Sequence, residues 1–226
     1  HIPGVFSFGN IIEAGINQIS HLSEIVYAYE QDSIYNTIEK VVDLFSKYKV
    51  GIDPTFLVMD IGWRNKNQPL SEIEPGAAFA NKYVLKTWEG FGTDSLRSLT
   101  RGKQVMSKEG EMIFKLYKAG IPVVAGADGG IPGHSLHREL ELYVKYGLTP
   151  MEALKTATTI PAQQMSMHPE KYFIRAGNTP NFVLLNGNPF ENISNVRNIF
   201  QIISNGKILN PDNLWQLIDF SPLKFN

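Results

Sequence analysis

The sequence predicts an α/β fold of the barrel type, in which short parallel strands alternate with helices. The main observation is the segment 120–141, which begins with an apolar run, Ile121 to Ala127, of the length and composition of a buried parallel strand. The run stops at a single acid, Asp128, and glycines 129, 130 and 133 lead into a helix expected to begin near Ser135. Two histidines, at the exits of other expected strands, repeat this arrangement.

A carboxylate at the carboxyl end of a buried strand is where α/β barrels place catalytic groups. The alternative interpretation of Asp128 and Gly129 is an acid that caps the next turn. His21 follows a short expected strand, Ile16 to Ser20, and His1 precedes a Pro-Gly loop typical of a strand exit. A lone histidine in such a place is more often a surface or core residue, but two of them together with Asp128 favour a metal site.

Composition limits the classes of function. The chain has 226 residues, 43% of them hydrophobic and 19% charged, which suits a globular protein with a sizeable core. The net charge of -1 gives no electrostatic footprint for nucleic acid or an anionic membrane, and no apolar run is long enough to span a bilayer. The chain has no cysteine, which excludes disulfides and thiolate metal sites, and its compartment stays unknown.

Helices are predicted from apolar residues at helical spacing between the expected strands. The expected helices are Ser7–Ala14, Ser33–Tyr48, Ser107–Ala119, Leu136–Tyr146 and one that begins at the capping box Thr149–Glu152. A further strand is expected over Val50–Pro54. Asp53 and Thr55 at its exit could face the site, although a turn role is the simpler interpretation.

The segment from Met59 to about Met106 has no simple periodicity. Residues 63–67 are expected to form an exposed loop, and Phe79–Trp88 is expected to be helical. An insertion of this length on the catalytic face of a barrel is typical of a lid or a substrate wall. An irregular helical pair without a function is the alternative.

Beyond Tyr172 the spacing of apolar residues changes from that of helices to that of extended strands. A strand is expected over Phe182–Leu185, and Ile199–Ser204, Asn205-Gly206 and Lys207–Leu209 form a strong hairpin pattern.

Taken together, these motifs resemble the end of the barrel in the amidohydrolase superfamily, the metal-dependent hydrolases that include imidazolonepropionase and dihydroorotase. The matching residues are G-A-D-G-G at 126–130, G-H-S-L-H-x-E-L at 133–140, and G-L-T-P-M-E-A-L-K-x-A-T at 147–158. The likeness continues through 177–189 and 199–209, and is weak between about 60 and 106.

The resemblance implies a fold and its boundaries. The family barrel has eight strands, and this chain would start around the fifth. Residues 1–172 would be the C-terminal half of a TIM-like (β/α)8 barrel, and residues 173–226 would be strands of a small β-sandwich. Relatives usually carry an Ala-Asp pair where this chain has Pro180 and Asn181, a departure at a structural position.

The resemblance also implies a chemistry. His1 and His21 match the metal-binding imidazoles of the fifth and sixth strands, and Asp128 matches the acid that both binds the metal and takes the proton from the attacking water. The cofactor would be a divalent metal such as Zn²⁺, for which two imidazoles and a carboxylate are suitable ligands. The reaction implied is hydrolysis of an amide-like or cyclic C–N bond in a small-molecule substrate.

Two elements of the family site are absent. The chain has no His-x-His pair, and the bridging group of the fourth strand would precede residue 1. The chain is therefore expected to hold at most half of the metal site, to bind Zn²⁺ weakly and to show no hydrolysis alone. It should associate with the missing N-terminal half of the barrel or with itself. His134 could contact substrate, whereas His137 is expected to be a packing or surface residue.

Two other functions stay open at this stage. The glycines at 126, 129, 130 and 133 suggest a phosphate-binding barrel module, although neither G-x-G-x-x-G nor a P-loop is present. A non-catalytic domain that keeps the fold but has lost the metal is the other alternative.

Overall fold

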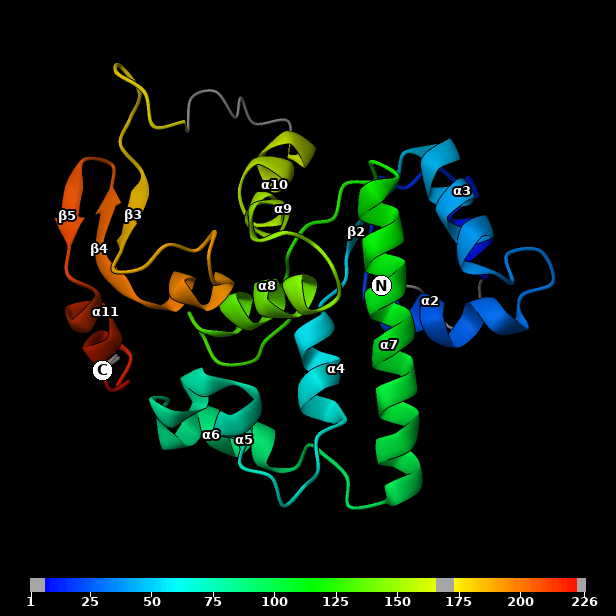
Figure 1. Cartoon of the computed structure of the whole chain (residues 1–226), viewed down its shortest axis with the longest axis horizontal. Coiled ribbons are helices and arrows are strands. Elements are labelled where there is room, and N and C mark those ends of the chain that lie inside the picture. The colour runs from blue at the N-terminus through cyan, green and yellow to red at the C-terminus, as the bar shows by residue number, and fades with distance from the viewer. Residues whose placement is uncertain (1–6, 166–172, 223–226) are drawn as a thin grey trace.

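The computed structural model describes residues 7–165 and 173–222 (Figure 1). It shows the mixed α/β fold that the sequence predicts. His1, the first of the predicted metal ligands, lies outside the described residues. No helix in the described part of the chain is long and apolar enough to cross a bilayer.

A short parallel sheet lies at the centre of the first 165 residues. Strand β1 (Gln18–Ser20) pairs in parallel with β2 (Gly51–Asp53), and Val123 forms a parallel bridge to Ile52 on the other side of β2. The Ile52 N–H donates to the Pro122 carbonyl over 2.9 Å, and the Val124 N–H donates to the Ile52 carbonyl over 2.8 Å. The order β1, β2, Val123 therefore brings three strand exits to one edge of the sheet.

The third strand is shorter than the predicted run from Ile121 to Ala127, which is a correction to the sequence-based expectation. Pro122 has no N–H to donate to a neighbouring strand. The Ala125 N–H donates to the Thr156 carbonyl over 2.9 Å, so that residue is bonded to the helical segment instead of the sheet. Only the residues around Val123 remain to pair with β2.

Helices and single 3-10 turns surround this sheet in chain order. They are α1 (Phe8–Glu13), α2 (Leu22–Ala28), η1 (Tyr29–Gln31), α3 (Ile38–Tyr48), α4 (Phe56–Gly62), α5 (Leu70–Ile73), η2 (Pro75–Ala78), α6 (Lys82–Glu89), α7 (Leu96–Lys118), α8 (Ser135–Lys145), α9 (Pro150–Thr156) and α10 (Thr159–Gln164). The long helix α7 contacts α2, α3 and α4, and in Figure 1 it stands upright between α4 and the pair α2 and α3. Ile19, Ile52 and Val123 are buried in the core beneath these helices.

Helix α7 begins eleven residues before the predicted start at Ser107. Its N-cap is Ser95, whose hydroxyl accepts from the Ser98 N–H over 3.3 Å. Two glycines lie inside the helix, both close to aromatic rings, and Gly102 interrupts the apolar pattern in the part that the prediction missed. A Cβ on Gly102 would lie 2.6 Å from the Trp63 side chain, and one on Gly110 would lie 2.0 Å from the ring of Tyr146. Both positions hold glycine because an aromatic side chain packs against each of them.

Helix α3 begins later than the predicted Ser33. Asp32 accepts from the N–H groups of Ile34 and Tyr35, each over 2.8 Å, and so forms a turn. The helix starts after Thr37, whose hydroxyl accepts from the Lys40 N–H. The capping box at Thr149 and Glu152 is confirmed, with both of its hydrogen bonds present.

The segment between α4 and α7 is helical in pieces rather than structureless. The prediction of an exposed loop at 63–67 is wrong at two positions, because Trp63 is half-buried and Arg64 is buried, at 7% exposed. The Arg64 guanidinium donates to the Trp88 carbonyl over 3.2 Å and so joins the loop to the end of α6. A cation can be buried when it donates hydrogen bonds to carbonyl groups. The polar sequence of this loop gave no indication that Arg64 is buried.

The C-terminal segment forms an antiparallel sheet of β3 (Phe182–Leu185), β4 (Ile199–Ser204) and β5 (Lys207–Leu209) in the order β3-β4-β5. The predicted hairpin is confirmed: β4 and β5 are joined at Asn205 and Gly206, both with positive φ. Within residues 173–222 these strands form one layer, so a sandwich is not established. The 3-10 turn η4 (Ile193–Arg197) precedes β4, and helix α11 (Pro211–Leu217) follows β5.

Arg197 joins the C-terminal segment to the helical layer. It is 5% exposed, and its guanidinium donates to Glu141 over 2.7 Å and 3.2 Å and to Glu74 over 2.9 Å. Glu74 is completely buried in the insertion, and Glu141 lies on α8. Three segments far apart in sequence therefore meet at one buried cation.

We expect Arg197→Met to lower the free energy of unfolding by about 3–5 kcal/mol, because it leaves two carboxylates without their buried partner. Urea denaturation monitored by circular dichroism measures the loss. The control is Arg175→Met, at an exposed arginine, which should change stability by no more than about 0.5 kcal/mol. Equal stabilities for the two variants would show that the buried network does not hold the segments together.

Candidate functional site

Three strand exits meet at the carboxyl edge of the parallel sheet, and each carries a strained residue. His21, Thr55 and Asp128 have φ values of 68°, 50° and 38°. This left-handed region is unfavourable for residues other than glycine, and such strain gathers at functional sites. The other non-glycine residues with positive φ in the described chain are Lys49, Asn205 and Asp219, which end helices or form the hairpin turn.

The structure brings two of the predicted site residues together. His21 Nε2 lies 3.8 Å from Asp128 Oδ2. The His21 side chain is only 14% exposed, whereas that of Asp128 is 54% exposed. The backbone N–H of His21 donates to the Asp53 carbonyl over 2.9 Å, which continues the pairing of β1 with β2 beyond the strand. The imidazole is therefore held against the sheet, and the carboxylate reaches it from the next loop.

Thr55 fixes the orientation of the His21 ring. Its hydroxyl donates to the Pro54 carbonyl over 2.8 Å and lies 2.7 Å from His21 Nδ1. A hydroxyl has one proton, so while it donates to Pro54 the Thr55 oxygen accepts from the imidazole. In the neutral ring Nδ1 then carries the hydrogen, and Nε2 is the acceptor nitrogen that faces Asp128. This is the tautomer that an Nε2 metal ligand requires.

Asp53 also lies at this edge. Its Oδ1 is buried without a hydrogen-bond partner among the described residues. Burial raises the pKa of this carboxyl, and nearby Asp128 acts in the same direction, while the Thr55 amide and His21 act against them. A Cβ on Gly126 would lie 2.2 Å from the Asp53 oxygens. Glycine at 126 is therefore what lets the Asp128 segment approach Asp53.

The simple turn role expected for Asp53 and Thr55 is incomplete, because both contact the site as well as form the turn. The sequence signal was present, since the Asp-Pro-Thr group follows a strand in the same way as the histidines and Asp128 do. The signal was hidden because an Asp-Pro-Thr sequence can also simply form a turn.

Helix α4, which starts directly after Thr55, is held by a buried acid that sequence reasoning missed. Glu139 of α8 is completely buried, and its two oxygens accept from the N–H groups of Phe56, over 3.0 Å, and Leu57, over 2.7 Å. Burial raises the pKa of Glu139 to about 8, although the two backbone hydrogen bonds lower it. The sequence did contain a signal for this role, because the acidic Glu139 stands among the apolar positions of the predicted helix Leu136–Tyr146.

The structure places His134 in an aromatic stack. The ring is completely buried, with its centroid 4.3 Å from that of Trp215 and 6.1 Å from that of Phe220. Burial lowers the pKa of His134 to about 4, and nearby Arg197 adds to this effect. The geometry gives the predicted substrate contact no support, because aromatic rings cover the imidazole. His137 is half-buried on α8, and burial likewise lowers its pKa to about 4.

The glycines after Asp128 have packing roles. A Cβ on Gly130 would lie 2.2 Å from Ser135 Oγ, and one on Gly133 would lie 2.5 Å from the Trp215 ring. Ser135 Oγ in turn accepts from the Ile131 N–H over 2.7 Å. Close approach of side chains therefore explains these glycines without a phosphate.

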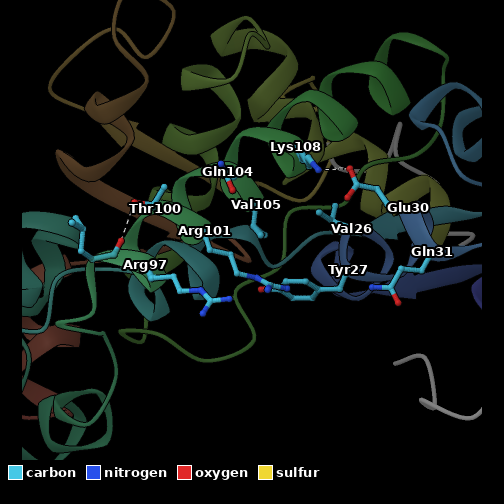
Figure 2. A pocket seen from close by; sticks show the side chains of 11 residues that line it. Val26, Tyr27, Glu30, Gln31, Arg97, Thr100, Arg101, Gln104, Val105 and Lys108 are labelled. Atoms are coloured by element: carbon cyan, nitrogen blue, oxygen red, sulfur yellow. Dashed lines mark hydrogen bonds and ion pairs between the residues drawn. The ribbon is translucent and has the colours of Figure 1, made fainter.

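An open cleft of about 720 Å³ lies between α2, η1 and the first half of α7 (Figure 2). Arg97 and Arg101 lie on its α7 wall, and the Arg101 guanidinium lies over the Tyr27 ring, 5.9 Å from its centroid. Neither arginine forms an ion pair with a carboxylate of the described residues. The acid of the cleft, Glu30, is paired with Lys108. Two such guanidinium groups can bind a carboxylate or a phosphate.

In the sequence, the α2 residues of the cleft follow His21 by only a few positions. Helix α2 begins directly after His21, and Tyr27 is six residues further, which corresponds to about 9 Å along a helix. His21 and the α2 residues of the cleft are therefore at opposite ends of the same short helix.

The donor atoms at the sheet edge fit part of a metal site. Two ligands of one ion can lie up to about 4 Å apart when each bond is about 2.1 Å long. The separation of 3.8 Å between His21 Nε2 and Asp128 Oδ2 is within this limit. In the described part of the chain, no group of three or more such side chains is placed to hold an ion. The spacing of these two side chains is therefore compatible with two ligands of one ion.

Comparison with known proteins gives consistent results. A family model described as "Amidohydrolase family" matches residues 64–209. Among solved structures, bottromycin amidohydrolase is similar with a TM-score of 0.68 and 18% identity, covering 96% of this chain and 51% of that one. A Xaa-Pro dipeptidase with methionine in its active site has a TM-score of 0.55 and 20% identity, covering 88% and 41%.

A third similar structure is the ochratoxinase of A. niger, with a TM-score of 0.53 and 22% identity, covering 87% of this chain and 37% of that one. No curated protein matches the sequence. The chain spans about half the length or less of the solved structures described above. At these identities the likeness to solved structures is a likeness of fold.

Proposed function

The chain belongs to the amidohydrolase family, and we propose that it is part of an enzyme that hydrolyses amide-like or cyclic C–N bonds with a divalent metal. The observation that carries the proposal is the group of three strained strand exits. They hold His21 Nε2 3.8 Å from Asp128 Oδ2 at the carboxyl edge of a parallel sheet. A domain selected only for packing has no need to hold three unfavourable conformations at one edge.

The proposed roles of Asp128 and His21 follow from the exposure of the Asp128 carboxylate and from the tautomer of the His21 ring. Asp128 is the general base, since its exposed carboxylate can accept the proton of the water that attacks the carbonyl carbon. His21 binds the metal through Nε2, with Thr55 holding Nδ1–H. When bound to His1, His21 and Asp128, an ion such as Zn²⁺ would supply Lewis acidity, which eases deprotonation of water and polarises the scissile carbonyl.

The cleft supports substrates that carry a negative group. Arg97 and Arg101 present guanidinium groups about one helical turn apart, with no carboxylate of the described chain bound to them. An amide with a free carboxylate would place its anion there and its C–N bond towards the strand exits. N-acyl amino acids, dipeptides and cyclic amides with a carboxylate are therefore the first compounds to assay, each beside its neutral analogue.

We expect Asp128→Asn, in the enzyme that contains residues 1–226, to fold normally and to lose about 10²- to 10⁴-fold in kcat, because the general base is gone. Asparagine accepts the left-handed backbone readily, so the loop should keep its shape. His21→Ala should lose bound metal as well as activity. Steady-state kinetics on the amide panel and metal analysis by mass spectrometry measure both.

The matched control is Asp219→Asn, since Asp219 is also an exposed aspartate with positive φ, at φ 56°, but lies after α11. It should leave kcat unchanged. If the Asp128 variant hydrolyses the substrate as fast as this control, the general-base role is wrong.

We also propose that the chain associates, either with a further segment that completes the barrel or with a second copy of itself. In the described residues β1 pairs with β2 on one side only, which leaves a strand edge. The C-terminal sheet also exposes apolar side chains, with Phe200 61% and Ile208 67% exposed. Both features are unfavourable in water and are relieved by association.

Residues 1–226 alone should therefore sediment as species heavier than the monomer of 25.3 kDa, with a concentration dependence between about 1 and 100 μM. Analytical ultracentrifugation measures this, with Zn²⁺ titration of the same samples. The expected zinc binding is weak and without hydrolysis. A stable monomer that binds one equivalent of zinc tightly would contradict the proposal.

A further inference from the structure

We propose that Glu139 is a positioning residue for His21: it caps helix α4 in place of Thr55, and so leaves the Thr55 hydroxyl to hold the imidazole. The inference deepens the proposed function, since it concerns the same site. It rests on hydrogen bonds among three segments that are far apart in sequence.

Thr55 stands where a helix cap belongs but does not act as one. It is the N-cap residue of α4, and an N-cap threonine ordinarily accepts from the N–H of the second or third helical residue. Here its φ of 50° is left-handed, and its side chain makes no capping hydrogen bond. The hydroxyl instead bonds to the Pro54 carbonyl and His21 Nδ1. The first amides of α4 therefore need another acceptor.

Glu139 supplies that acceptor from α8. Its oxygens accept separately from Phe56 N–H and Leu57 N–H, the first two amides of α4. The two bonds fix the start of α4 and with it the backbone of Thr55, which directly precedes Phe56. The chain of contacts then runs from α8 through Thr55 to the ring of His21.

The cost of burying Glu139 indicates that its position is specific. The carboxylate is completely buried, and no cation contacts it in the described chain. Glu109 of α7 is a useful comparison, since it is also completely buried but has no hydrogen-bond partner among the described residues. Burial raises the pKa of Glu109 well above its ordinary value. Of these two acids, only Glu139 accepts hydrogen bonds from the start of α4, in the segment that holds His21.

The test is the tautomer of His21 in the metal-free chain, measured by ¹⁵N NMR of labelled imidazole with Glu139→Gln. In the parent protein the neutral ring should be in the Nδ1–H form. A glutamine amide can accept from only one of the two α4 amides, and its NH₂ group opposes the other. We therefore expect the ratio of Nδ1–H to Nε2–H to fall by about tenfold, which corresponds to one hydrogen bond of ordinary strength.

Three further variants make the result decisive. Thr55→Val removes the hydroxyl directly and should lower the ratio at least as much, and adding Glu139→Gln to it should change nothing more. The matched control Glu109→Gln should leave the ratio as in the parent. Should Glu139→Gln not fold, Glu139→Asp keeps a carboxyl group on a shorter side chain and should give an intermediate ratio.

A folded Glu139→Gln or Glu139→Asp variant with the parent tautomer would overturn the proposal, as would an equal change in Glu109→Gln. The readout requires neither metal nor substrate. Failure of the hydrolase proposal therefore leaves this result valid, and a negative result here leaves the roles of Asp128 and the metal untouched.

Discussion

The hydrogen bond of 2.7 Å between Thr55 Oγ1 and His21 Nδ1 is the contact on which the geometry of the site depends. It joins the exits of two neighbouring parallel strands and selects the nitrogen that faces Asp128. The sheet register brings the exits together, since Ser20 pairs with Asp53 and Val123 bridges to Ile52. Left-handed backbone at each exit then turns the side chains towards one another.

Much of this arrangement could be predicted from sequence, because apolar runs that end in polar residues mark strand exits. That reasoning located His21 and Asp128 and the final hairpin. It missed Glu139 and gave Thr55 a turn role, since their partners are 82 or more residues away and 34 residues away. Local patterns carry no information on such pairs. Tertiary packing also determined the first turns of α7, where Gly102 under Trp63 interrupts the apolar pattern.

His134 shows the opposite case. A histidine directly before a helix and six residues after Asp128 suggested a substrate contact, whereas in the structure Trp215 and Phe220 from the end of the chain stack on its ring. Arg197 likewise joins the C-terminal segment to α8 and the insertion. The C-terminal segment therefore packs against the loop that follows Asp128. The Asp128 carboxylate itself stays exposed at the sheet edge.

The proposed metal site makes His21 Nε2 and Asp128 Oδ2 ligands of one divalent ion. Anomalous diffraction at the zinc absorption edge, from crystals of this chain soaked in Zn²⁺, can locate that ion. We expect an anomalous peak about 2.0–2.2 Å from both atoms, and no peak there in crystals of His21→Ala. Zinc bound only elsewhere at saturating zinc would show that these two atoms do not share an ion.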